Sequence, residues 1–159
     1  MDYKQGNADE LKHTFWKAFA SSPFCFLERK AQPGDAVVMT AQLDKDANSA
    51  IWFFTRKDHH LAQMGPAFVT YAGKDNQIFA RIEGTLVEET SRERLDEMYG
   101  TITDAWFDGK DDPNLLMLRF DLGSAEIWNS DLGMINNAKM LMGMDVTEEA
   151  KENHVETTL

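Results

Sequence analysis

The sequence predicts a single, mainly β domain, an antiparallel β-barrel with helices on its flank. The chain has 159 residues, the ordinary size of one domain, and 43% of them are apolar, which is enough to form a core. About six or seven short apolar segments are separated by polar turns, and only about two or three segments have helical periodicity. A helix packed on a curved, cone-shaped sheet has a similar number of elements, so this alternative stays open.

The chain begins with an amphipathic helix over residues 8–21. Leu11, Phe15 and Phe19 recur there at helical spacing, and Pro23 follows the end of the pattern. One face of this helix is therefore expected to pack on the barrel.

Strands joined by turns come next. A strand over residues 24–29 is separated by the turn residues 32–35 from a second strand over residues 36–43. The polar residues 44–49 predict a hairpin loop, after which the chain returns as a strand over residues 51–55.

The middle of the chain alternates between short elements. A helix over residues 58–64 is expected to end at Gly65-Pro66. Two strands follow, over residues 67–71 and 77–88, and Gly84 lies inside the second one.

The last predicted elements begin with a helix over residues 90–99, which Ser91 can cap. Apolar segments predict strands over residues 115–122 and 125–128. The methionine-rich residues 134–144 could form a further helix, packed on the body or on a second subunit.

Composition limits the partners and the location. We expect residues 1–144 to form one domain and the acidic residues 145–159 to form a flexible tail. The formal net charge of −11 disfavours nucleic acid and anionic membranes as partners. No apolar segment approaches the roughly 20 residues that span a bilayer, and residues 1–6 lack the apolar part of a secretory signal. Cys25 is the single cysteine, so we expect a cytoplasmic protein in which it is a small buried side chain.

Residues 51–60 carry the clearest functional signal. The apolar strand ends in Thr55, Arg56 and Lys57, directly before a helix that is expected to begin at Asp58. A hydroxyl, two cations and the N–H groups of a helix start are groups that bind a phosphate. The alternative interpretation is a solvated strand end with a surface mixture of charges.

The histidines do not predict a metal site. His59 and His60 are adjacent, so on a helix they lie about 100° apart and cannot hold one ion together. His13 and His154 are distant in sequence. We therefore expect no bound metal, and we expect His59 or His60 to contact the anion. The chain also lacks a P-loop, a Gly-x-Gly-x-x-Gly motif and a Gly-x-Ser-x-Gly motif.

Four features occur in a fixed order and carry a family resemblance. They are Val38-Met39-Thr40-Ala41-Gln42, then Ile51 to Asp58, then Glu83-Gly84, and then Ala105-Trp106-Phe107 with Asp111 to Leu115 and Ala125 to Trp128. Together they resemble the general stress protein 26 branch of the pyridoxamine 5′-phosphate oxidase-like, FMN-binding split-barrel superfamily. The resemblance covers about residues 8–130.

The resemblance implies an antiparallel Greek-key split barrel and a homodimer with flavin at the subunit interface. It implies FMN as the cofactor, with FAD as the alternative, and redox activity with a small-molecule electron donor or acceptor. The residues that it places near the cofactor are Val38, Met39, Thr40 and Ala41 along the flavin ring, Phe54, Thr55, Arg56, Lys57 and His60 around the phosphate, and Trp106 and Trp128 near the pocket or the interface.

The chain also departs from the family pattern. Many relatives carry Arg-Pro where this chain has Val37 and Val38, and Ser and Lys where it has His59 and Leu61. The Arg- and His-containing motif with which pyridoxamine phosphate oxidases bind their substrate does not follow, so we do not expect oxidation of vitamin B6. No catalytic acid or base is indicated. A non-catalytic module that binds or buffers flavin is therefore the alternative to an oxidoreductase.

Overall fold

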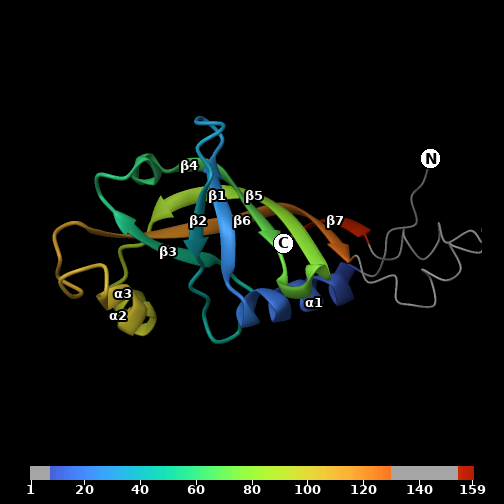
Figure 1. Ribbon diagram of the computed structural model, residues 1–159, viewed down its shortest axis with the longest axis horizontal. Helices are drawn as coiled ribbons and strands as arrows, with labels where there is room; N and C mark the ends of the chain where they lie inside the picture. Colours follow the sequence, from blue (N-terminus) through green and yellow to red (C-terminus); the bar gives the residue numbers. More distant parts are fainter. Residues whose placement is uncertain (1–7, 130–153) are drawn as a thin grey trace, which may run out of the picture.

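The structure is a computed structural model that describes residues 8–129 and 154–159. These residues form an antiparallel sheet of seven strands, curved into an open barrel, with α1 and α2 toward opposite ends (Figure 1). The elements in chain order are α1 (Ala8–Ser21), β1 (Phe24–Arg29), β2 (Val37–Thr40), β3 (Ile51–Arg56), η1 (His60–Gln63), β4 (Gly65–Ala72), η2 (Lys74–Asn76), β5 (Ile78–Glu88), α2 (Arg92–Met98), α3 (Thr101–Asp104), β6 (Leu115–Asn129) and β7 (His154–Thr158).

The order of the strands is that of a split barrel. They run β2-β1-β4-β5-β6-β3, and β7 also pairs with β6. Because β3 lies beside β6 rather than beside β4, the path is a Greek key. The two edge strands approach each other at an isolated bridge, in which the backbones of Gln42 and Trp52 exchange hydrogen bonds of 2.8 and 2.9 Å. The sheet is not closed, and the predicted fold class is confirmed.

β6 is one strand of 15 residues, where the sequence predicted two. Residues 123–124, which separate the two predicted strands, lie at an irregularity in the β5–β6 pairing, where the register shifts between Ile82 and Gly84. A Cβ atom on Gly84 would lie 2.3 Å from the carbonyl oxygen of Asp121, so the close approach of the strands requires glycine here.

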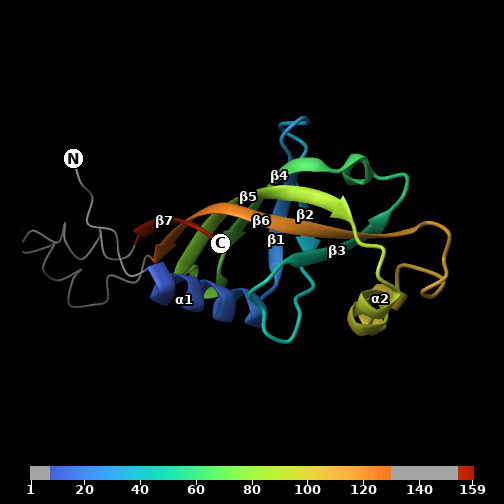
Figure 2. The same cartoon turned by 180° about the vertical axis from the view of Figure 1, so that it is seen from behind.

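α1 covers the barrel with an aromatic stripe. Phe15, Trp16 and Phe19 are buried. The ring centroid of Phe19 lies 4.8 Å from that of Tyr71 in β4, and the Tyr71 hydroxyl donates to the Ala18 carbonyl at 3.1 Å. Figure 2 shows the helix lying along the end of the barrel where β7 is found. None of the helices within the described residues has the length and apolar character that crossing a lipid bilayer requires.

The predicted hairpin of residues 36–43 and 51–55 is wrong. Except for the Gln42–Trp52 bridge, β2 pairs with β1 and β3 pairs with β6. The polar loop between β2 and β3 connects the two edges of the sheet and does not form a tight hairpin turn. A sequence pattern of this kind reports that the chain turns, but the partner of a strand is decided by contacts that are distant in sequence.

Two further local predictions need correction. The helix predicted over residues 58–64 is the four-residue 3-10 helix η1, which begins at His60. The flexible tail predicted for residues 145–159 is wrong over 154–158, which form β7 with Val155 buried in the core. One apolar residue in a five-residue strand produces no period that sequence analysis can detect. Residues 145–153 and the helix predicted for residues 134–144 lie outside the described residues.

Candidate ligand-binding site

A pocket of about 510 Å³ opens between β2, the end of β3 and the segment around α3. This volume falls in the range of small-molecule sites. Segments that are distant in sequence meet here because β2 and β3 are the two edges that face each other across the split of the barrel. The pocket is lined by Val38, Met39, Thr40, Gln42, Phe54, Thr55, Arg56, His59, Ile102, Thr103, Trp106 and Phe107.

One wall of the pocket is apolar and aromatic. Val38 is 64% exposed and Trp106 is 77% exposed. The ring of Phe54 packs edge-on against Tyr99, with 6.0 Å between the ring centroids, so it is supported from behind by the end of α2. The backbone N–H of Trp106 donates to the carbonyl of the buried Thr103 at 3.0 Å. Supported aromatic groups that remain open to solvent are suited to stack on a planar ligand.

The other end of the pocket is polar and positively charged. β3 ends here in Thr55, which is buried, and Arg56, whose side chain is half exposed. The Nε of Arg56 donates to the carboxylate of Asp58 at 3.3 Å. This contact uses one of the five N–H groups of the guanidinium, so the terminal amino groups can donate to a ligand. A hydroxyl and a guanidinium together favour an anionic group at this end.

The loop between α3 and β6 holds the end of β3 in place. The carboxylate of Asp112 accepts hydrogen bonds of 2.8 Å from the backbone N–H groups of Asp108 and Asn114. The backbone N–H of Lys57 donates to the carbonyl of Asn114 at 3.0 Å. The two bonds to its carboxylate, together with the positive charge of Arg56, lower the pKa of Asp112. Asp112 is therefore ionised at neutral pH and fixes the loop beside the polar end of the pocket.

His59 lies in the pocket in a defined tautomeric state. Its Nδ1 accepts a hydrogen bond from the backbone N–H of Leu61 at 3.1 Å and so caps η1. The proton of the neutral imidazole therefore sits on Nε2, which can act as a hydrogen-bond donor. Burial, followed by the positive charge of His60, lowers the pKa of His59, while Asp58 acts in the opposite direction.

Four of the predicted cofactor-binding residues lie outside this pocket. Ala41 is buried in the core, and Lys57 is not part of the lining. His60 stacks on His59 at 4.3 Å between ring centroids, but its Nε2 faces the Asp35 carbonyl at 3.2 Å. Trp128 lines a different hollow. The α-helix start that was expected to supply N–H groups at Asp58 does not form, because η1 begins at His60.

The hollow that contains Trp128 is apolar and has a volume of about 500 Å³. Its exposed large apolar residues are Phe24, Phe26, Val38 and Trp128, and we call these four residues the apolar face. Phe26 and Val38 are register partners in β1 and β2, so their side chains are neighbours on one surface of the sheet. Val38 lines both hollows, which makes the apolar face continuous with the pocket.

Several residues that line the pocket were not among the predicted cofactor-binding residues, although His59 had been considered as an alternative to His60 for contact with the anion. The residues are Gln42, His59, Ile102, Thr103 and Phe107. α3 was not predicted, because four residues are too few for a helical period. The one available signal was the aromatic pair that follows it.

Comparison with known proteins supports the split-barrel fold described above. The family described as pyridoxamine 5′-phosphate oxidase like matches residues 10–152. The chain belongs to this family. A general stress protein 26 from Jannaschia sp. CCS1 is 30% identical with a TM-score of 0.76, and the match covers 96% of this chain and 100% of that one.

Two Xanthomonas proteins have similar structures. The general stress FMN/FAD binding protein from the phytopathogen Xanthomonas citri is 35% identical with a TM-score of 0.73, over 80% of this chain and 94% of that one. A general stress family protein from Xanthomonas campestris pv. campestris is 34% identical with a TM-score of 0.73, over 82% and 94%. No curated protein matches the chain. The predicted membership of the general stress protein 26 branch is confirmed.

Proposed function

We propose that this protein binds FMN in the pocket between β2, β3 and α3 and acts as a flavin-dependent oxidoreductase on a small molecule. The observation that carries the proposal is that one pocket combines an apolar, aromatic wall with Thr55, Arg56 and His59 at one end. The wall fits a flat tricyclic ring, and the polar end fits a phosphate. The similar protein from Xanthomonas citri is described as FMN/FAD binding, which supports a flavin as the ligand.

The donor set at the polar end supports a phosphate specifically. Thr55 offers a hydroxyl, Arg56 offers terminal N–H groups and His59 offers Nε2–H in its neutral form. None of these three side chains is an anion that would repel a phosphate. When bound, flavin supplies the electron chemistry, and the protein supplies binding, orientation and shielding from water.

We further propose that a second copy of the chain covers the apolar face. Phe24, Phe26, Val38 and Trp128 are 57%, 51%, 64% and 38% exposed, and a cluster of this kind marks an interaction surface. Size-exclusion chromatography with light scattering should give the mass of a dimer. Phe26→Glu should shift the protein to a monomer, and Thr85→Glu, an equally charged change at an exposed position of β5, should not. A wild-type protein that is monomeric at every concentration would contradict the proposal.

Flavin binding is tested by titrating the purified, flavin-free protein with FMN, FAD and riboflavin. Quenching of flavin fluorescence reports binding of each. We expect FMN to bind more tightly than riboflavin, which has the same ring but no phosphate. If none of the three flavins binds, the proposal fails.

A non-catalytic flavin-binding module is the second candidate function. One observation favours it. Among the described residues that line the pocket, only Arg56 and His59 have ionisable side chains. His59 is thus the one side chain there that can exchange a proton near neutral pH. Anaerobic mixing of the flavin-loaded protein with NADH or NADPH distinguishes the two candidates. An oxidoreductase should bleach the visible absorption of flavin faster than the same concentration of free FMN is bleached.

A further inference from the structure

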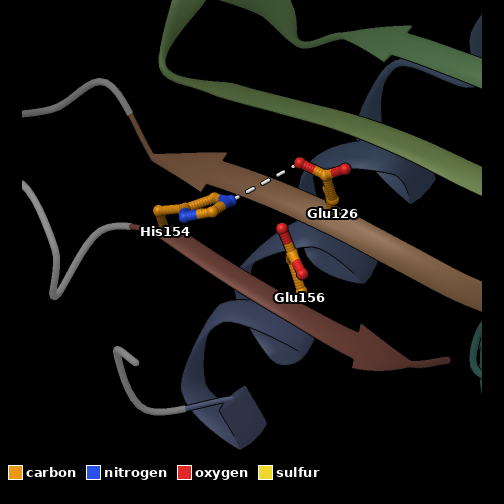
Figure 3. A group of neighbouring side chains, drawn as sticks. All are labelled: Glu126, His154 and Glu156. Atoms are coloured by element: carbon orange, nitrogen blue, oxygen red, sulfur yellow. Dashed lines mark ion pairs between the residues drawn. The ribbon is translucent and has the colours of Figure 1, made fainter. Parts of the chain in front are cut away.

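The end of the sheet remote from α2 carries a cluster of side chains that the proposed flavin site does not use. Glu126 of β6 and His154 and Glu156 of β7 each direct one potential ligand atom to the same place, and these atoms lie within 4.8 Å of one another (Figure 3). Glu126 pairs with Glu156 across the two strands, and Trp128 pairs with His154. Residues two apart on a strand share a face, so all four side chains lie on one surface of the sheet.

The cluster contains a like-charge contact that a bound cation would relieve. Two carboxylates directly opposite each other on neighbouring strands repel. Arg81 approaches Glu126 at 3.9 Å through Oε1, while it also pairs with Glu83 at 3.5 Å. The second oxygen of Glu126, Oε2, faces His154 instead. Arg81 is half exposed and is shared between Glu83 and Glu126. The charge of Glu156 is therefore not balanced by Arg81.

The imidazole of His154 provides a second, independent observation. Its ring stacks on Trp128, with 5.3 Å between the centroids and 17° between the planes, so its orientation is set by packing. Its Nε2 atom is buried and makes no hydrogen bond within the described residues, since Oε2 of Glu126 is 3.6 Å away. A buried nitrogen without a hydrogen bond is costly, and its one contact in the cluster is an ion pair with Glu126 that requires a protonated imidazole.

We propose that Glu126, His154 and Glu156 bind a divalent transition-metal ion, with Zn²⁺ as the best match. Zn²⁺ takes imidazole nitrogen and carboxylate oxygen at about 2.0–2.2 Å, and tetrahedral sites with three protein ligands leave a fourth position to water. Donors on such an ion lie roughly 3–3.5 Å apart, a distance that small rotations of the two glutamate side chains would reach. Mg²⁺ and Ca²⁺ prefer sites made only of oxygen, so a histidine disfavours them.

The ion would fasten β7 to β6. It links two residues of the C-terminal strand to the sheet, beside the buried Val155. Binding that occurs only in the folded state raises stability with ligand concentration, so the site should be visible both as heat of binding and as thermal stabilisation.

The test is calorimetric titration of Zn²⁺ into the full chain, free of tag, metal and flavin. We expect one ion per chain, and at least tenfold weaker binding in both His154→Gln and Glu156→Gln. The matched controls are His13→Gln in α1 and Glu88→Gln in β5, which change exposed residues of the same types and should bind as the wild type does. Zn²⁺ should also raise the melting temperature of the wild type but not of His154→Gln.

Glu156→Gln keeps the test independent of folding. It removes a like-charge contact with Glu126, so without metal it should be at least as stable as the wild type. A wild-type protein that binds no Zn²⁺ overturns the proposal, and so does unchanged Zn²⁺ binding in both ligand variants. These outcomes leave the proposed flavin site untouched, because the two sites share no residue.

Discussion

Replacing Arg56 by glutamine tests the polar end of the pocket. Among the described residues that line the pocket, Arg56 is the one that stays positively charged throughout the physiological pH range, and glutamine keeps most of its length while it removes the charge. If a flavin phosphate binds here, the variant should lose affinity for FMN but not for riboflavin.

The size of the effect follows from the surroundings of Arg56. A hydrogen bond from a charged group contributes about 1.5–3 kcal/mol. The side chain is half exposed and shares its Nε with Asp58, so we take the lower end of that range. About 1.5 kcal/mol corresponds to roughly a tenfold increase in the Kd for FMN. Thr55→Val removes a neutral donor and should cost about 1 kcal/mol, or roughly fivefold.

The assay is a fluorescence titration of each variant with FMN and with riboflavin. Lys57→Gln is the matched control, because it removes the neighbouring positive charge from a residue that is exposed and outside the pocket lining. At about 0.15 M salt, screening should limit its effect to about twofold. The same control distinguishes two assignments of the phosphate-binding residues. The sequence pattern includes Lys57, whereas in the structure Lys57 lies outside the pocket lining.

Three outcomes would refute the reasoning. An equal loss for FMN and riboflavin would show that Arg56 supports the pocket and not the phosphate. An unchanged Kd for FMN would place the phosphate elsewhere. A larger loss in Lys57→Gln than in Arg56→Gln would favour the arrangement expected from the sequence.

Other measurements test the fold and its titratable groups. Gly84→Ala should lower the free energy of unfolding by about 1–3 kcal/mol, because its Cβ would meet the Asp121 carbonyl, whereas Gly100→Ala meets nothing within 4 Å and should change it little; equal effects in urea unfolding would contradict this. The pKa of His59 is lowered in the folded state, so the unfolded chain binds that proton more readily and stability should fall as the pH drops below about 6.5, less steeply in His59→Gln. Burial raises the pKa of Cys25 to about 12, so its thiol should react with a disulfide reagent only after unfolding; rapid reaction of the native protein would refute this.

The sequence predicted local elements well where one face is buried. The helical spacing of Phe15 and Phe19 predicted α1, and Pro23 marked its end. Ser91 was predicted as a cap and is the N-cap of α2, although the predicted helix began earlier, at Thr90. Pairing was predicted less well, because the residues of β6 that pair with β3 lie 59 to 69 positions further along the chain, from Arg56–Leu115 to Ile51–Phe120. β7 could not be found, since its buried residue is a lone Val155 among polar neighbours.

The same contrast between local and long-range features holds for the candidate site. The end of β3 was found because Thr55 and Arg56 follow a buried strand directly, so chain order alone places them at its tip. The sequence left open whether His59 or His60 contacts the anion, and the structure places His59 in the pocket lining and His60 outside it, because His59 is the N-cap of η1. The expectation that no metal binds was based on the spacing of the histidines along the chain. That spacing could not show that β7 brings His154 beside Glu126.

The pocket and the apolar face are linked through one edge strand. β2 has a strand neighbour on one side only, so Val38 is open both to the pocket and to the face that includes Phe26. A second copy that covers the apolar face would also cover Val38, and flavin affinity would then depend on assembly. Phe26→Glu should therefore weaken FMN binding, although Phe26 does not line the pocket. A monomeric Phe26→Glu protein with the wild-type Kd for FMN would show instead that one chain completes the site.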